Sequence, residues 1–318
     1  MITLSTEKGL VRIESWEDVE SRPGFTRNLD PSTAVLAEII GQYHFKDMFP
    51  CGLAGCRQPH AKGYLITTKD GRETNIGNVC GVRYFSVEFK QLRKVFRVSR
   101  EDQERRERLH ALQSRVAGLR GELHALRNGS PTLQSLQVHI GVLLGRTGGL
   151  PRGVREAIAR TVRSGTGALT YERVLTKLER DRLRAAQEGA GNASRGSIPT
   201  AVEEQVGHLL GFTALAAGND MRTLLLAIET ALEQLMTADV DSLDSRALKT
   251  LSKLTSSIDP ALTSLRGARA NALKLLAAAN LRQLEVFTDS PSERRVLRDF
   301  IASAAAGLAA QRQPAAVA

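Results

Sequence analysis

The chain of 318 residues is poor in several features on which secreted and membrane proteins depend. It has three cysteines and one tryptophan, and aromatic residues make up only 4% of it. No apolar run approaches the roughly 18 residues that span a bilayer, and residues 1–20 carry acids without the apolar core of a signal peptide. An odd number of clustered cysteines also argues against a disulfide framework. We therefore expect a cytoplasmic protein.

Motifs of common enzymes are also missing. The sequence has no glycine-rich phosphate loop ending in Gly-Lys-Ser/Thr, no Gly-x-Ser-x-Gly elbow and no His-Glu-x-x-His motif. Acid pairs such as Asp239 and Asp241 are typical of solvated loops and helix caps. The sequence therefore favours a non-enzymatic protein, although a site assembled from distant residues would leave no such motif.

Positive charge is in excess, and the excess is local. The net charge is +10. Residues 51–128 carry 16 basic and 8 acidic side chains, and residues 129–199 carry 11 and 5, so these segments contribute +8 and +6. Residues 1–50 have a net charge of −3, and residues 200–318 have a net charge of −1. A local concentration of cations predicts a polyanionic partner. A solvated, arginine-rich helix surface is the alternative interpretation.

Residues 51–89 contain every cysteine and a well-spaced histidine. The pattern Cys51-x4-Cys56-x3-His60-x19-Cys80 supplies three thiolates and an imidazole, a tetrahedral set for zinc. An Asp-Gly turn between the strand-like residues 63–68 and 72–76 predicts a β-hairpin that returns the chain to Cys80 at a helix start. We predict a closed, structural zinc site, with His44 as the alternative fourth ligand. Three buried thiols beside a surface histidine are the metal-free interpretation.

This order of features resembles a treble-clef zinc finger: a turn with paired cysteines, a β-hairpin, and a Cys-Gly helix start. The resemblance covers residues 51–89 only, and it implies a structural zinc ion. Treble clefs usually place a further ligand one turn into the helix. Arg83, Tyr84 and Phe85 occupy that region here, so His60 has to stand in.

The segment before the cysteines is expected to support this module. Residues 1–6 and 10–16 are strand candidates around a Glu-Lys-Gly turn. Asp30-Pro31-Ser32 is a typical helix start, because aspartate caps helices and proline is tolerated at their first position. Apolar residues at 35, 36, 39 and 40 then recur at helical spacing, which predicts a helix ending near Gly41.

A leucine seam runs through the segment after the module. Its six apolar positions alternate spacings of three and four, as in a coiled coil. They are Leu109, Leu112, Val116, Leu119, Leu123 and Leu126. Asn128-Gly129-Ser130-Pro131 is predicted to end this helix. The seam has to meet another helix, either in the same chain or in a second copy, and the short connection would let residues 133–143 fold back on it as an antiparallel hairpin.

The remaining chain is predicted to be helical. Helices are expected at 152–162 and 170–186, after a capping box at 200–203, and then at four further starts marked by Asp220, Leu248, Asp259 and Ser290. The predicted domains are an α+β zinc-binding module at 1–89, a helical or coiled-coil region at 90–187, a linker at 188–199, a helical bundle at 200–303 and a disordered tail at 304–318. The fold class is therefore mainly α, with a small α+β N-terminal module.

These features favour a zinc protein that associates with DNA or RNA. Five basic and two aromatic side chains of the module are the predicted phosphate contacts and stacking surface. They are Arg57, Lys62, Lys69, Arg72, Arg83, Tyr64 and Tyr84. Basic helices over residues 90–127 would extend this surface. The alternative is a zinc-stabilised protein–protein scaffold that oligomerises through the Leu109–Leu126 seam.

Overall fold

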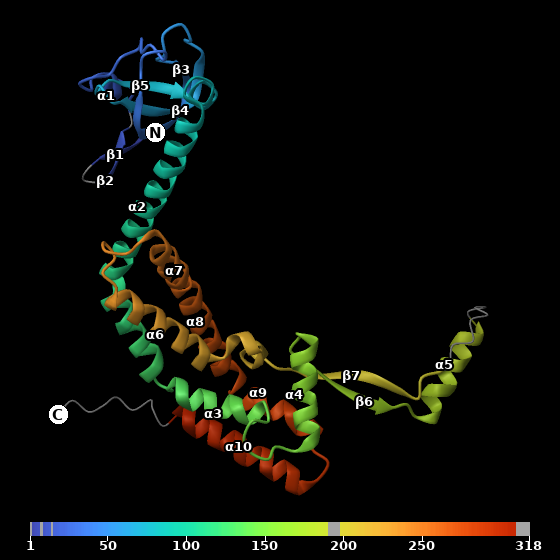
Figure 1. Ribbon diagram of the computed structural model, residues 1–318. Coiled ribbons are helices and arrows are strands. Elements are labelled where there is room, and N and C mark those ends of the chain that lie inside the picture. The colour runs from blue at the N-terminus through green and yellow to red at the C-terminus, as the bar shows by residue number, and fades with distance from the viewer. Residues whose placement is uncertain (1, 7–8, 14, 190–197, 310–318) are drawn as a thin grey trace, which may run out of the picture. The chain divides into compact units, whose positions relative to one another are not determined.

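The computed structural model describes residues 2–309 except residues 7–8, 14 and 190–197. The chain is mainly α with a small α+β N-terminal part, as predicted (Figure 1). It divides into two compact units, an N-terminal unit of residues 1–114 and 237–253 and a second unit of residues 115–236 and 254–318. Among the described helices, none combines the length and the apolar character that crossing a bilayer requires.

A five-stranded antiparallel sheet organises the N-terminal unit. Its strand order is β2-β1-β3-β4-β5. The bounds are β1 Ile2–Thr6, β2 Gly9–Ile13, β3 Leu36–Pro50, β4 Pro59–Thr68 and β5 Glu73–Gly77, and a short helix α1, Glu17–Glu20, follows β2. The two predicted N-terminal strands and the predicted hairpin around the Asp-Gly turn are therefore confirmed.

The helix predicted to begin at Asp30 is wrong, because that segment leads into β3. Asp30 closes a turn instead, where its Oδ1 accepts a hydrogen bond from the Ser32 amide at 2.9 Å. Ile39 and Ile40 pack into cores on opposite faces of the sheet, as neighbours on a strand do. The pairing register of β3 with β4 shifts near both residues. These shifts interrupt the strict alternation of the two faces, so the apolar positions at the start of β3 have a helix-like spacing.

Each face of the sheet carries its own core. On one face Trp16 packs against Tyr43 and Phe49, with ring centroids 5.3 and 4.3 Å apart. On the other face Ile66 and Ile76 pack with the helix that follows β5. Burying both faces explains why this small sheet is rich in aromatic residues in a chain that otherwise has few.

Helix α2, Asn78–Asn128, starts at the end of β5 and ends where the Asn-Gly-Ser-Pro sequence predicted. Its backbone leaves the helical region once, at Ser86, where φ is 44° and ψ is −114°. Phe85, Phe89 and Phe96 are buried in the core shared with the sheet. Tyr84, the neighbour of Phe85 on this helix, is exposed.

Helices of the same chain cover the leucine seam within the second unit. Val116, Leu119 and Leu123 are at most 7% exposed. Charged residues that flank the seam reach two other helices, α6, Met221–Thr237, and α8, Ile258–Leu275. These ion pairs are Arg127–Glu229 at 3.0 Å, Arg115–Asp259 at 3.1 Å and Arg266–Glu122. The predicted hairpin partner, α3 Leu133–Leu143, packs against α8 instead.

Two of the predicted helices contain strands. Strand β6, Ala168–Val174, occupies the start of the expected helix 170–186, and only α5, Lys177–Gly189, is helical. Strand β7, Ala201–His208, replaces the helix expected after residue 200 and pairs with β6. This long-range pairing overrides the capping-box signal. The predicted linker lies between these two strands, and its residues 190–197 fall outside the described chain.

The other predicted helices are confirmed as α4, Arg152–Ser164, α7, Ser245–Thr255, and α10, Pro291–Ala309, together with α6 and α8. Asp220 caps α6 through the Thr223 amide at 3.0 Å, and Ser290 caps α10 through the Glu293 amide at 3.2 Å. A short helix α9, Ala278–Arg282, and three 3₁₀ segments, Phe212–Leu215, Ala217–Asn219 and Gln283–Phe287, complete the described elements. Helix α10 includes residues 304–309, where a disordered tail was expected; the rest of that tail falls outside the described residues.

Candidate metal centre and basic groove

Three cysteines that are distant in sequence meet in the N-terminal unit. The sulfur atoms of Cys51, Cys56 and Cys80 all lie within 4.8 Å of one another, and Cys56 Sγ is 3.4 Å from Cys80 Sγ. A shared zinc ion with bonds of about 2.3 Å would hold sulfurs at separations of this order. This cysteine cluster could therefore bind a metal ion.

Backbone hydrogen bonds place the three sulfurs. Cys51 directly follows β3, and its amide donates to the Gln58 carbonyl at 3.0 Å. Cys56 lies in the intervening turn, where its amide donates to the Leu53 carbonyl at 3.2 Å. Cys80 lies in the first turn of α2, as predicted. The cluster thus ties a strand end and a tight turn to the start of the long helix.

The three thiols differ in their tendency to ionise. Burial raises the pKa of Cys51, and burial together with the neighbouring thiols raises the pKa of Cys80 to about 12. Partial burial acts in the same direction on Cys56, but its pKa is lowered on balance by the Gln58 amide, the other two thiols and the charge of Arg83. Three thiolates so close together repel each other, and a bound dication would relieve this repulsion.

His60 is not among the side chains whose ligand atoms meet at the cysteine cluster. The Tyr43 hydroxyl is 2.8 Å from His60 Nδ1, and the His60 Nε2 atom is buried with no hydrogen-bond partner. A β-carbon added at Gly77 would lie 2.6 Å from the ring, so glycine is needed there. Burial lowers the pKa of His60, which favours the neutral imidazole that can bind a metal. The alternative ligand His44 lies on β3, opposite Lys62.

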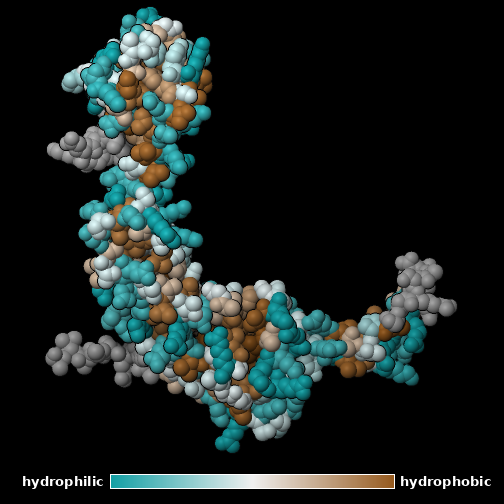
Figure 2. All heavy atoms as spheres, viewed as in Figure 1, coloured by the Kyte–Doolittle hydropathy of each residue, from teal (hydrophilic) through white to brown (hydrophobic). Residues whose placement is uncertain are grey.

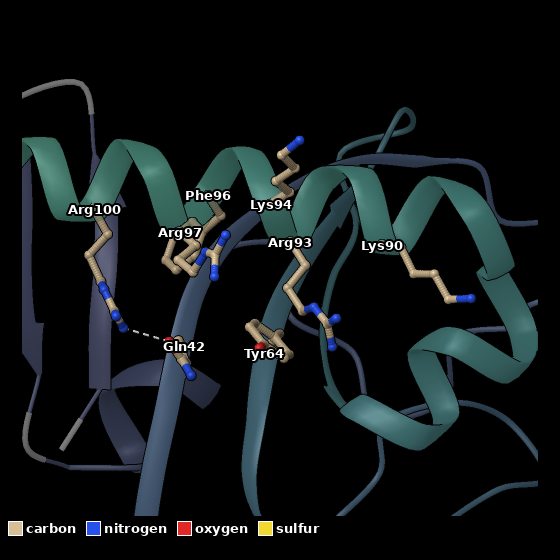
Figure 3. Close-up of a pocket in the computed structure, with 8 residues that line it drawn as sticks. All are labelled: Gln42, Tyr64, Lys90, Arg93, Lys94, Phe96, Arg97 and Arg100. Carbon is tan, nitrogen blue, oxygen red and sulfur yellow. Dashed lines mark hydrogen bonds between the residues drawn. The ribbon is translucent and has the colours of Figure 1, made fainter. Parts of the chain in front are cut away.

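A basic groove of about 500 Å³ lies between α2 and the sheet (Figure 3). Its lining consists of five cations, two aromatic rings and an amide. These residues are Lys90, Arg93, Lys94, Arg97, Arg100, Tyr64, Phe96 and Gln42. Figure 3 shows Arg93, Arg97 and Arg100 directed toward the strands that carry Gln42 and Tyr64, whereas Lys94 points the opposite way.

The cations of this groove are largely without counter-charges. Arg100 donates to Gln42 Oε1 at 2.6 Å and lies 3.6 Å from the Glu104 carboxylate, and Arg93 donates to the Asn78 side chain. In the described part of the chain, no carboxylate forms an ion pair with Lys90, Arg93 or Arg97. The groove is therefore a concave, positively charged surface on which most of the cations have no carboxylate partner among the described residues.

The seven nucleic-acid contacts predicted from the sequence lie in three places. Tyr64 lines the basic groove, and Lys62 lies on the same strand face, two residues away on β4. Arg83 and Arg57 lie by Cys56, and Tyr84 contacts Arg83, whose guanidinium carbon is 5.6 Å from the ring centroid. Lys69 and Arg72 lie at the β4–β5 turn, where Arg72 forms an ion pair with Asp70. The fold therefore does not gather them into one surface.

Sequence reasoning did not single out the individual cations of the groove. A signal was present, because Lys90, Arg93, Arg97 and Arg100 recur every three or four residues and so share one face of a helix. Gln42 had no such signal, since the start of its strand was expected to be a helix ending near Gly41. On the visible face of the N-terminal unit, hydrophilic and apolar residues are interspersed (Figure 2). The lining of the groove is distinguished by its five cations.

Comparison of this chain with protein-family models, with curated proteins and with solved structures found no match.

Proposed function

We propose that this protein is a non-enzymatic, zinc-stabilised nucleic-acid-binding protein. The observation that carries the proposal is the basic groove beside an aromatic side chain. Among the described residues, Arg100 is the one cation of the groove that has a carboxylate partner, and the start of the helix that carries these cations lies at the cysteine cluster. Phosphate groups are the polyanions that such rows of Lys and Arg recognise. A protein–protein scaffold built on the leucine seam is less well supported, because helices of the same chain cover that seam.

In this proposal the zinc ligands are Cys51, Cys56, Cys80 and His60. The buried, unpartnered Nε2 of His60 is the donor that would complete the set. For Nε2 to bind the ion, Nδ1 has to carry the ring proton and donate it to the Tyr43 oxygen. Bound zinc would then fix the two cysteines of the turn to the first turn of α2, and with it the wall of the basic groove.

Elemental analysis of the purified full chain tests the metal assignment. We expect one zinc ion per chain, lost in Cys56→Ser and weakened in His60→Ala. His44→Ala is the matched control, since it removes the alternative histidine, and it is expected to keep the metal. A folded wild-type protein free of metal, or loss of metal with His44→Ala alone, would contradict the assignment.

Fluorescence anisotropy with labelled DNA and RNA tests the nucleic-acid assignment. Affinity should fall steeply between about 50 and about 200 mM salt, because binding releases counterions from the phosphates. The double variant Arg93→Glu/Arg97→Glu should weaken binding to every sequence. Arg246→Glu, an exposed position on α7 of the same unit, is the control for a general change of charge.

Charge reversal at Arg57 and at Arg72 tests the two basic places outside the groove. We expect smaller losses there than for Arg93→Glu/Arg97→Glu, because Arg72 is already paired with Asp70. If no nucleic acid binds at low salt, the proposal fails and the scaffold interpretation takes its place.

A further inference from the structure

We infer that the basic groove takes single-stranded nucleic acid, with one base against Tyr64 and the phosphates along α2. This inference rests on the proposed function and adds the form of the ligand. It depends on where the cations, the aromatic ring and the sheet lie relative to each other.

The cations form a line that suits an extended chain of charges. Lys90, Arg93, Arg97 and Arg100 follow one another at one per helical turn, so they are spaced by about 5 Å over roughly 15 Å of helix. A single phosphate group can contact only part of such a line. Lys62 on β4 extends the positive surface beyond the groove, so a polymer with a phosphate on every unit matches it better than an isolated anion.

The aromatic ring lies where only an unstacked base could reach it. Tyr64 is half-buried in the groove, and it is held by an edge-to-face contact with Phe89 at a centroid distance of 5.5 Å. The Phe89 side chain is fully buried, so the position of the tyrosine is well defined. Bases in a duplex are stacked on each other, whereas those of a single strand are free to stack on an aromatic side chain.

The sheet also stands in the way of a duplex. Proteins commonly read double-stranded DNA by placing an exposed helix in the major groove. Here the face of α2 that carries Arg93, Arg97 and Arg100 is turned toward β3 and β4 (Figure 3), so the strands occupy the space that a duplex would need. A groove volume of about 500 Å³ is in the range of sites for small ligands, which fits a nucleotide and not a helix.

Titrations of the full chain with a labelled oligothymidylate and with a duplex of the same length test this inference. Wild type should bind the single strand more tightly at the same salt concentration. Tyr64→Leu should lower single-strand affinity by roughly tenfold and leave duplex affinity unchanged, and Tyr64→Phe should retain binding. Arg97→Ala should reduce the salt slope of single-strand binding by about 0.7, the value for one phosphate contact.

Tyr84→Leu is the discriminating variant, because Tyr84 was also predicted from the sequence to stack on bases but is an exposed tyrosine of the same unit outside the groove. It should leave binding unchanged. Two results would overturn the inference and leave the proposed function standing. One is equal affinity for the single strand and the duplex with no effect of Tyr64→Leu. The other is a loss of affinity in Tyr84→Leu alone. Absence of binding to either form removes the proposed function itself. Thermal unfolding of Tyr64→Leu monitored by circular dichroism confirms that the variant is folded.

Discussion

The Tyr43 hydroxyl lies 2.8 Å from Nδ1 of His60, across two adjacent strands. Asn75 Nδ2 donates a second hydrogen bond to the same hydroxyl at 3.3 Å. Burial raises the pKa of Tyr43 well above its usual value, so the phenol stays neutral. The tyrosine therefore fixes the orientation of the histidine ring beside the cysteine cluster.

Tyr43→Phe should weaken zinc binding without abolishing it. The variant keeps the ring that packs against Trp16 but loses the hydrogen bond that orients His60, and removal of such a partner typically costs 10–100-fold in metal affinity. Competition with a chromophoric chelator measures this change. Tyr84→Phe is the control, since among the described residues no hydrogen bond or ring contact joins Tyr84 to His60. An unchanged affinity in Tyr43→Phe would remove His60 from the proposed ligand set.

Removal of the metal should unfold the N-terminal unit while most of the helix content remains. The protein has a single tryptophan, Trp16, which is 8% exposed in the core on the far face of the sheet. Its fluorescence reports on this unit, because a structural zinc ion contributes directly to folding. A strong chelator should shift the emission of Trp16 to longer wavelength and abolish nucleic-acid binding. Unchanged emission after verified loss of metal would contradict a structural role.

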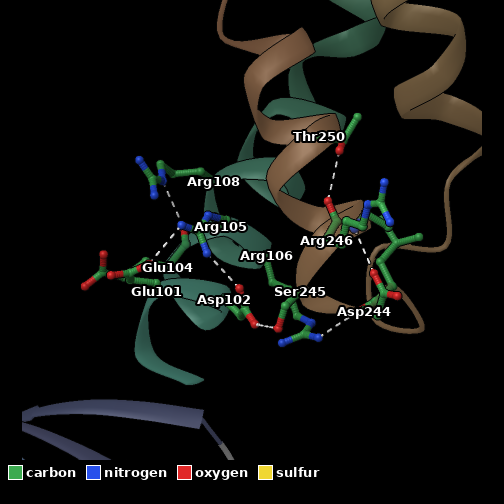
Figure 4. Close-up of polar contacts among 12 residues, drawn as sticks. Glu101, Asp102, Glu104, Arg105, Arg106, Arg108, Asp244, Ser245, Arg246 and Thr250 are labelled. Atoms are coloured by element: carbon green, nitrogen blue, oxygen red, sulfur yellow. Dashed lines mark hydrogen bonds and ion pairs between the residues drawn. The ribbon is translucent and has the colours of Figure 1, made fainter. Parts of the chain in front are cut away.

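Asp102 should matter more for stability than its neighbour Glu101, although both contact Arg105 (Figure 4). Asp102 is 5% exposed, and its carboxylate accepts hydrogen bonds from Arg105 Nη1 at 2.7 Å and from the Ser245 hydroxyl. Asp102→Ala removes the acceptor of the Ser245 hydroxyl and leaves Arg105 with only its ion pair to Glu101, so it should cost about 1–3 kcal/mol of the free energy of unfolding. Glu101→Ala removes an exposed ion pair, which is typically worth about 0.2–1 kcal/mol. Urea denaturation compares the two variants.

His110 should give a small, pH-dependent contribution to stability. Its ring lies 3.0 Å from the Asp241 carboxylate, which raises the pKa of His110 above 6.5. A raised folded-state pKa gives stability that is fully present below the unfolded value of 6.5 and is lost as pH rises through the folded value. His110→Gln should therefore be less stable than wild type at acidic pH and equal to it at alkaline pH.

The His110 effect should be on the order of a few tenths of a kcal/mol, because both side chains are exposed. Asp241→Asn should produce the same pH-dependent loss, which identifies the pair and not the histidine alone. Denaturant unfolding at the two pH extremes measures it. A loss that is equal at both extremes would show that the ion pair is not its origin.

Local signals in the sequence predicted much of this fold. The Asp-Gly turn, the caps at Asp220 and Ser290 and the helix stop after Asn128 each act within a few residues, so they could be recognised directly. The clustering of the three cysteines was predicted in the same way, because the hairpin between Cys56 and Cys80 necessarily returns the chain. The mainly helical character followed from the spacing of leucines.

Only the tertiary structure decided the features that depend on distant partners. β3 is a strand because β1 and β4 pair with it, and β7 is a strand because β6 pairs with it, against local signals for helix in both segments. The basic groove exists because α2 lies across the face that carries Gln42 and Tyr64. The leucine seam is internal because α6 and α8 cover it. Pairing and packing between distant segments set these outcomes, and local spacing in the sequence does not encode them.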